Sequence, residues 1–250
     1  MRRLSVFFLL FVMAVPASAQ QRVLGLDRLS IVVKDLARAR ADLGGLGFTV
    51  RSDRPHDPSV ATAYVKFHDG SALELISPVS DDAATTKYRD WLKDGEGPMS
   101  FGLYRPGSTN VPPPGVFFGA RERSATDMFE DFQHDNSAQS LLGVWLAGSP
   151  SERKIANLPG AKLVNGAFCM PLGYGAKAVR FGDAEIPLLP ESAQLTPGRP
   201  IIAATIAVDK LDIAHGYFDG RGKRYRKVTG CGGLSLWVEI RGLWLEFRER

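Results

Sequence analysis

Two glutamates and one arginine occupy positions where a side chain could take part in chemistry. Glu74 is the middle residue of a Leu-Glu-Leu triplet, and Glu246 is the middle residue of a Leu-Glu-Phe triplet. Arg28 lies in a strand-like stretch near the start of residues 26–78, and Glu74 lies near the end of the same range. A carboxylate can move a proton, and a guanidinium can bind a carboxylate or another anion. We therefore take Glu74 as the candidate catalytic residue, and Arg28 and Glu246 as candidate ligand-binding residues.

Two of the four histidines lie in loops that could border a binding cleft. His56 stands in a loop rich in proline and aspartate, and His134 lies just before an apolar run that contains Trp145. We interpret all three side chains as candidate ligand contacts. Two alternatives stay open, a solvated loop at His56 and an Asx-type turn at His134. We expect His68, at a hairpin tip, and His215, on the polar side of a helix, at the surface.

Residues 26–78 have the pattern of a βαβββ unit. Leu29, Ile31 and Val33 alternate as in a half-buried strand. Asp35 can cap a helix with apolar residues at positions i, i+3 and i+7. Three more strands are then expected at 48–52, 61–67 and 70–78.

The end of the chain repeats this pattern. The apolar helix positions recur at a constant offset of 175 residues, and the closing Leu-Glu pair recurs as well. The equivalent helix residues are Leu36, Ala39 and Leu43 in the first unit and Leu211, Ala214 and Phe218 in the last. Residues 140–190 predict a third βαβββ unit, and 85–132 predict a second unit that has lost its helix. Such repetition supports a modular fold.

The ends of the first unit, Leu-Asp-Arg at 26–28 and Leu-Glu-Leu at 73–75, resemble the vicinal oxygen chelate superfamily. Within it they resemble the glyoxalase-like proteins, whose first module opens with Leu-Asp-His. The resemblance implies an α+β fold in which repeated βαβββ modules pair into cupped mixed sheets (glyoxalase/dioxygenase-like). It implies that the cup holds the metal and the substrate. The loops at His56 and His134 resemble family segments at the cleft.

Metal-dependent members of that superfamily place a histidine on the first strand of a module and a glutamate on the fourth. Imidazole and carboxylate together suit a divalent ion with open positions. Here the first-strand position holds Arg28, Leu141 and Ala203 in the three recognisable units, and the fourth-strand position holds Glu74, Ile186 and Glu246. We assign no metal ligand and no cofactor. A retained divalent metal, an Arg–Glu ion pair and an anion site at Arg28 stay open as alternatives.

Residues 1–19 have the features of a secretory signal peptide. Two arginines precede an apolar run that ends in Ala-Ser-Ala. Cleavage after Ala19 would leave 250 − 19 = 231 residues and lower the formal charge from +4 to +2. We therefore expect a periplasmic or secreted protein without a stable membrane anchor. The small positive charge gives no indication of nucleic-acid binding.

The mature chain divides into an N-terminal glyoxalase-like half, 24–134, and a C-terminal half of two modules, 139–250. Cys169 and Cys231 could form a disulfide in an oxidising compartment. We expect an exported glyoxalase-like protein that binds a small molecule. As an enzyme it would be of lyase, isomerase or dioxygenase type, acting on a small oxygenated substrate. The alternative is a non-catalytic binding or sequestering protein, and the oligomeric state is open.

Overall fold

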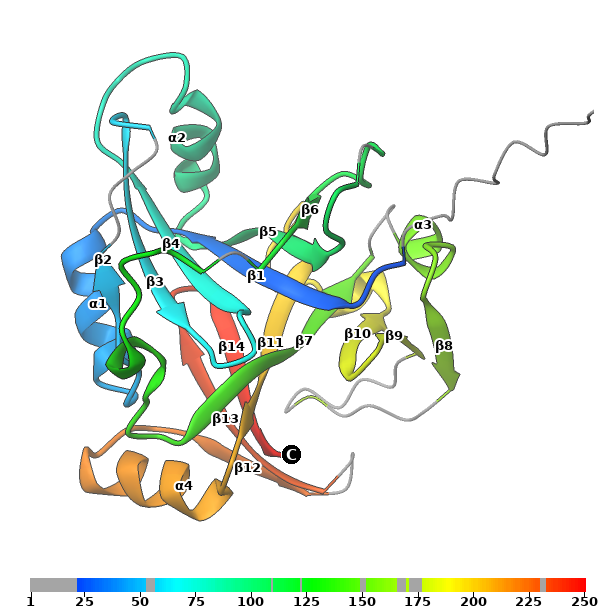
Figure 1. Cartoon of the computed structure of the whole chain (residues 1–250). Coiled ribbons are helices and arrows are strands. Elements are labelled where there is room, and N and C mark those ends of the chain that lie inside the picture. Colours follow the sequence, from blue (N-terminus) through cyan, green and yellow to red (C-terminus); the bar gives the residue numbers. More distant parts are fainter. Residues whose placement is uncertain are drawn as a thin grey trace, which may run out of the picture.

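The computed structural model describes residues 22–52, 57–108, 110–121, 123–148, 152–165, 170, 177–229 and 233–250. His56 and both cysteines lie outside these ranges, so the predictions on them are not tested. The described strands form two mixed sheets with few helices (Figure 1). Within the described ranges, no helix is long and apolar enough to cross a membrane.

The first sheet contains six strands in the order β2-β3-β4-β1-β5-β6. Its central strand, β1, runs parallel to β4 and antiparallel to β5. The strands are β1 (Gly25–Val32), β2 (Arg51–Ser52), β3 (Val60–Lys66), β4 (Ala72–Pro78), β5 (Gly97–Tyr104) and β6 (Val116–Gly119). The accompanying helices are α1 (Leu36–Gly44), α2 (Thr86–Lys93) and the 3-10 helix η1 (Phe129–Phe132).

The second sheet contains eight strands in the order β12-β13-β14-β11-β7-β10-β9-β8. The chain enters it through β7 (Ala138–Ala147), α3 (Glu152–Ala156), β8 (Lys162–Asn165), β9 (Lys177–Phe181) and β10 (Ala184–Leu189). After the 3-10 helix η2 (Glu191–Ala193) it continues through β11 (Ile201–Val208), α4 (Leu211–Gly220), β12 (Arg226–Thr229), β13 (Leu234–Ile240) and β14 (Leu243–Glu249). Two βαβββ units therefore join through β11 and β7, which are antiparallel neighbours.

The βαβββ units expected at 26–78 and 201–250 are both confirmed. Asp35 caps α1 as expected, because its side chain accepts a hydrogen bond from the Arg38 backbone N–H over 2.9 Å. The apolar helix positions of α1 and α4 are buried as the repeat predicts, apart from the half-buried Leu36. After α2 the chain forms β5 and β6, and no helix lies between them in residues 105–108 and 110–115.

The expected strand at 48–52 is shorter than predicted, since only Arg51 and Ser52 pair with β3. Phe48 instead turns into the core and is 4% exposed. Thr49 bonds to the segment before β7: its backbone N–H donates to His134 Nδ1, and its hydroxyl donates to the Gln133 carbonyl. Tertiary contacts thus override the strand propensity of this stretch.

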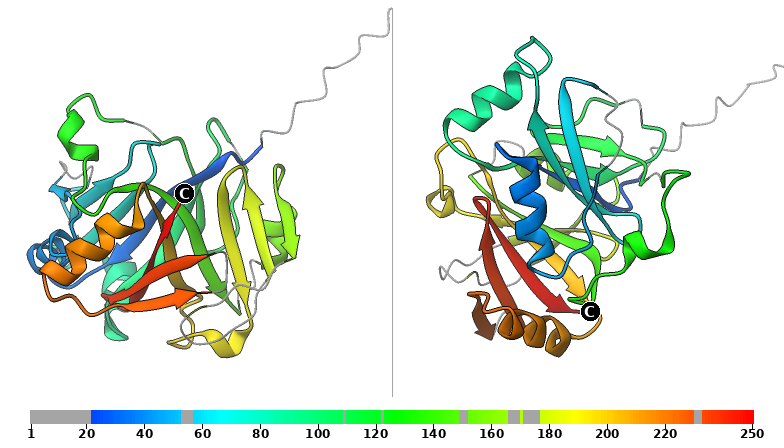
Figure 2. Two further views of the ribbon diagram at one scale, coloured as in Figure 1. Left: turned by 90° about the horizontal axis from the view of Figure 1, so that it is seen from below. Right: turned by 90° about the vertical axis from the view of Figure 1, so that its left-hand side faces the viewer.

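One hydrophobic core joins the two sheets with α1 and α4. Figure 2 shows the two helices close together, and the Tyr217 hydroxyl of α4 donates to the Gly44 carbonyl of α1 over 3.4 Å. Across the halves, the Phe48 and Phe247 rings stack with centroids 5.7 Å apart. Successive strand residues face opposite sides of a sheet. Leu29 points to the core, so its neighbours Arg28 and Ser30 lie on the other face. That other face of each sheet is the cup.

Candidate functional site

Glu74 lies on the cup face of the first sheet within a group of hydroxyl donors. The parallel register of β1 and β4 places Ser30 beside it, and β3 places Tyr64 on its other side. Ser30 Oγ donates to one carboxylate oxygen over 2.6 Å, and the Tyr64 hydroxyl donates to the other over 2.7 Å. These charge-assisted bonds hold the carboxylate in one orientation. A carboxylate offers about four acceptor sites, so a ligand donor can still bind.

Arg28 lies two residues before Ser30 on the same face of β1. Its Nε donates to Asp27 over 3.1 Å, its Nη1 lies 3.7 Å from Glu74 Oε1, and its guanidinium carbon lies 5.2 Å from the centre of the Phe117 ring. Burial alone would lower the pKa of Arg28, but the carboxylates of Glu74 and Asp27 together raise it above its usual value. The side chain therefore stays charged, and at 37% exposure it remains accessible.

Two cavities share Arg28 in their walls. The smaller, of about 290 Å³, is here called the Glu74 cavity, and α2 contributes Lys87 and Tyr88 to its lining. Its other lining residues are Ser30, Ile76, Met99, Ser100 and Phe117. The larger, of about 500 Å³, is here called the Arg123 cavity, and its charged lining consists of Asp27, Arg28, Lys66, Arg121, Arg123 and Asp127. The larger volume lies within the usual range for small-molecule sites.

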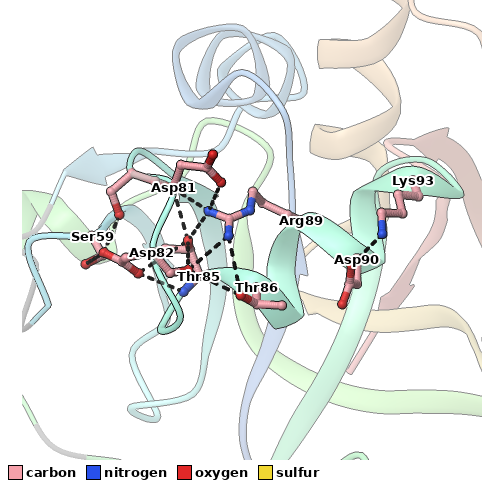
Figure 3. Close-up of polar contacts among 9 residues, drawn as sticks. Ser59, Asp81, Asp82, Thr85, Thr86, Arg89, Asp90 and Lys93 are labelled. Atoms are coloured by element: carbon pink, nitrogen blue, oxygen red, sulfur yellow. Dashed lines mark hydrogen bonds and ion pairs between the residues drawn. The ribbon is translucent and has the colours of Figure 1, made fainter.

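A polar network before α2 holds the helix that lines the Glu74 cavity (Figure 3). The Asp82 carboxylate accepts the hydroxyls of Ser59 and Ser80, each over 2.6 Å, and these bonds lower the pKa of Asp82 to about 2. Arg89 on α2 donates to the Thr85 hydroxyl over 2.6 Å and pairs with Asp81 at 2.7 Å. The network thereby connects the start of β3 to α2.

His134, a sequence-predicted ligand contact, lines neither cavity. Its Nδ1 accepts from the Thr49 backbone N–H over 3.1 Å, so its Nε2 carries the proton and donates to the Lys66 carbonyl, also over 3.1 Å. The ring lies edge-on to Phe48 and Phe67. Burial lowers the pKa of His134 to about 4. This geometry gives His134 a structural role in holding the segment before β7 against Thr49 and the end of β3.

Glu246 repeats the first glutamate in the second sheet but is only 2% exposed. Thr205, its neighbour in the parallel register of β11 and β14, donates to it over 2.6 Å, and the Trp145 indole N–H donates to Thr205 over 2.8 Å. Trp145, Trp237 and Trp244 pack together on this face. Burial raises the pKa of Glu246. Tryptophan side chains therefore fill the cup face of the second sheet beside Glu246.

The third unit also has a carboxylate, Glu185, at the position equivalent to Glu74 and Glu246. The alignment of the units in the sequence placed Ile186 there, one residue away. Glu185 pairs with Gly143 across β10 and β7, as Glu246 pairs with Thr205. Ile186, expected at that position, is fully buried in the core. A slip of one residue along a strand exchanges its two faces, so short sequence patterns cannot fix the alignment at this point.

The described residues on the two cup faces do not fit a divalent metal ion. Among the described residues, no group of three or more His, Cys, Asp or Glu side chains could hold one. In the first sheet, the histidine position holds Arg28, whose charge lies 3.7 Å from Glu74 Oε1 and would repel a cation. In the second, Ala203 supplies no ligand atom. We therefore assign no metal-ligating residue.

Several solved structures share this architecture. A xylose isomerase-like TIM barrel/4-hydroxyphenylpyruvate dioxygenase fusion protein superposes with a TM-score of 0.60 at 12% identity, over 92% of this chain and 50% of that one. A triple mutant of 4-hydroxymandelate synthase from Streptomyces coelicolor gives 0.56 at 11% identity, over 91% and 93% of the chains. A catechol 2,3-dioxygenase gives 0.54 at 13% identity, over 92% and 93%.

The fold is of the vicinal oxygen chelate type. Its cupped α+β sheets of βαβββ modules are those of dioxygenase-type members, as the sequence predicted. The chain spans half the length of the fusion protein. No protein-family model and no curated protein matches the sequence. Identities of 11–13% relate these structures by fold alone.

Several residues of the cup were not among the site residues predicted from the sequence. Ser30 had a detectable signal, because Thr205 repeats its hydroxyl at the same offset of 175 residues that relates the helices. Tyr64 had none, since its contact with Glu74 depends on the register of β3 and β4. Arg121 and Arg123 line the Arg123 cavity from positions that belong to neither a strand nor a helix, about 95 residues beyond Arg28.

Proposed function

We propose that the cup of the first sheet binds a small oxygenated anion and that Arg28 anchors its anionic group. The observation that carries this proposal is the position of Arg28, a charged and accessible side chain in the walls of both cavities. Its guanidinium has five donor hydrogens and uses only part of them on Asp27 and Glu74. The lining of the Glu74 cavity contains two cations, Arg28 and Lys87, and one carboxylate, Glu74.

Glu74 gives this site selectivity among anions. Its carboxylate accepts hydrogen bonds and repels a second negative charge. An anionic group at Arg28 is therefore best accompanied by a hydroxyl or another donor directed at Glu74. Ring contacts are available as well, because the Phe117 ring lies against Arg28 and Tyr88 lines the same cavity. These features favour hydroxy acids on a planar scaffold.

A second candidate function is catalysis in the same cavity, with Glu74 as the group that moves a proton. The position of Glu74 in the lining of the Glu74 cavity supports it, as does the fold shared with the 4-hydroxymandelate synthase and the catechol 2,3-dioxygenase. A glyoxalase-like lyase or isomerase would be one form of it. Arg28 in place of histidine favours binding over this alternative, because a guanidinium cannot ligate a metal ion that would stabilise a developing enediolate.

Calorimetric titration with 4-hydroxybenzoate and benzoate tests the proposal. Arg28→Gln should weaken binding of both acids at least tenfold, whereas Arg153→Gln on α3 removes an equal charge from an exposed position outside both cavities and should change nothing. Equal affinities in the wild type and Arg28→Gln would refute the proposal. Glu74→Gln separates the two candidates, since it should abolish turnover of any substrate but only reduce the preference for the hydroxylated acid in a binding protein.

The proposal includes export, on the strength of the signal-like segment 1–19. Expression of the full chain with cell fractionation tests it. The mass of the periplasmic or secreted form should correspond to a chain that begins at Gln20. An uncleaved chain retained in the membrane fraction would contradict this part of the proposal.

A further inference from the structure

The charged residues that line the Arg123 cavity are mostly basic. Of its charged lining residues four are basic and two acidic, a net charge of 4 − 2 = +2. Both carboxylates are already engaged by the protein. Asp27 accepts from Arg28 Nε and from the Arg121 backbone N–H, the latter over 2.7 Å. Asp127 accepts from Lys66 and from the Ser124 backbone N–H.

Arg123 is the basic residue of this cavity with the fewest commitments. Within the described part of the chain it has no carboxylate partner, and its Nη2 donates to the His68 carbonyl over 2.8 Å. Its guanidinium carbon lies 4.8 Å from the centre of the Phe132 ring. By contrast, Arg121 bonds to the Leu26 and Asp69 carbonyls and pairs with the Asp69 carboxylate. An arginine stacked on a ring with free donors is preorganised for a planar anion.

The walls of the Arg123 cavity combine this charge with aromatic surface. Phe118 and Phe132 line it together with Ser71 and Ser124. A volume of about 500 Å³ admits an aromatic scaffold larger than a single carboxylate group. Because Arg28 belongs to both walls, one ligand can contact Arg28 and extend toward Arg123.

We propose that the ligand is an aromatic dianion, with one anionic group at Arg28 and a second at Arg123 in the larger cavity. This inference rests on the proposed function, because it uses Arg28 as the anchor. It adds the chemical class of the ligand and a second specificity residue. A monoanion leaves the charge of Arg123 unpaired, whereas a dianion with the right separation pairs both arginines.

Calorimetry with matched acids tests the inference. The probes are benzoate against terephthalate, and 4-phenylbenzoate against biphenyl-4,4′-dicarboxylate, so that each pair differs by one carboxylate on a rigid scaffold. In the wild type, the dicarboxylate of at least one pair should bind at least tenfold more tightly than its monoacid. Arg123→Gln should reduce that ratio to about one and leave the monoacid affinity within twofold. Arg123→Lys should keep most of the preference, and the control Arg153→Gln should keep all of it.

The two proposals fail in different ways in this experiment. If Arg28→Gln weakens the monoacids but no dicarboxylate is preferred, or if Arg123→Gln leaves the preference unchanged, the dianion inference is wrong and the anion site at Arg28 stands. If Arg28→Gln changes neither affinity, or if no acid binds, both are wrong. Circular dichroism and urea unfolding of each variant establish that its fold is retained.

Discussion

Replacement of His134 by glutamine should remove a large part of the acid sensitivity of this protein. The imidazole of His134 is buried between Phe48 and Phe67, accepts from the Thr49 N–H and donates to the Lys66 carbonyl. Burial disfavours the charged form of the ring, and it lowers the pKa of His134 from 6.5 to about 4. In addition, a protonated ring could not accept the hydrogen bond from Thr49.

The sign and size of the effect follow from this shift. Between pH 6.5 and about 4 the unfolded chain binds a proton at His134 that the folded chain does not, so stability falls as the pH falls. The difference of about 2.5 pH units, at 1.36 kcal/mol each, corresponds to a loss of about 3 kcal/mol. Below pH 4 the loss from this group is complete.

Urea unfolding at a series of pH values measures the effect. The free energy of unfolding of the wild type should fall by about 3 kcal/mol more than that of His134→Gln between pH 7 and 4. Glutamine is neutral and can both accept and donate a hydrogen bond, so it suits the same site. The control His215→Gln removes a half-buried histidine of α4 and shows whether the effect is specific to His134. Parallel curves for the wild type and His134→Gln would refute this account of the ring.

Three other substitutions test particular parts of the structure. Arg28→His should raise the affinity for Zn²⁺ or Ni²⁺ in calorimetry, because it places an imidazole on the cup face with Glu74; no gain would contradict that placement. Glu246→Gln should make the protein more stable relative to the wild type at pH 8 than at pH 5 in urea unfolding. Burial raises the pKa of Glu246, so the wild-type protein loses stability as the pH rises and this carboxyl must ionise in the folded state. A difference between the two proteins that does not change with pH would argue against this. Asp82→Asn should speed amide hydrogen exchange in α2 at neutral pH, and this difference should vanish as the pH falls through about 2, the pKa of Asp82; unchanged exchange would show that the network does not hold the helix.

Much of the fold could be predicted because its local signals agree with one another. Asp35 caps α1, and the apolar positions of α1 recur in α4, where Leu211, Ala214 and Phe218 are buried as expected. A repeated pattern of this kind identifies the module before any contact is known. The shortened strand at 48–52 was not predictable in the same way, since the bonds of Thr49 to residues 133 and 134 depend on tertiary packing.

The candidate site was predictable only in part. The pairing of Arg28 with Glu74 followed from the superfamily pattern, and the two side chains are indeed neighbours on the cup face. Trp145 lies next to Glu246 through Thr205, but in a buried cluster that only packing could create. The Arg123 cavity had no local signal, because Arg121 and Arg123 are held by polar contacts to residues distant in sequence, Asp27 on β1 and His68 in the turn between β3 and β4.

The hydroxyl and carboxylate pair occurs in both sheets but in different surroundings. Ser30 and Glu74 face a cavity, whereas Thr205 and Glu246 lie beneath tryptophan. The same strand register thus supports an accessible site in one half and a packed core in the other. This difference is the physical basis for placing ligand binding in the first cup.

A crystal structure with biphenyl-4,4′-dicarboxylate or terephthalate tests the central claim most directly. The account predicts ligand density in the cup of the first sheet, with one carboxylate in contact with the Arg28 guanidinium. Density on the tryptophan face of the second sheet, or on the surface away from Arg28, would contradict it.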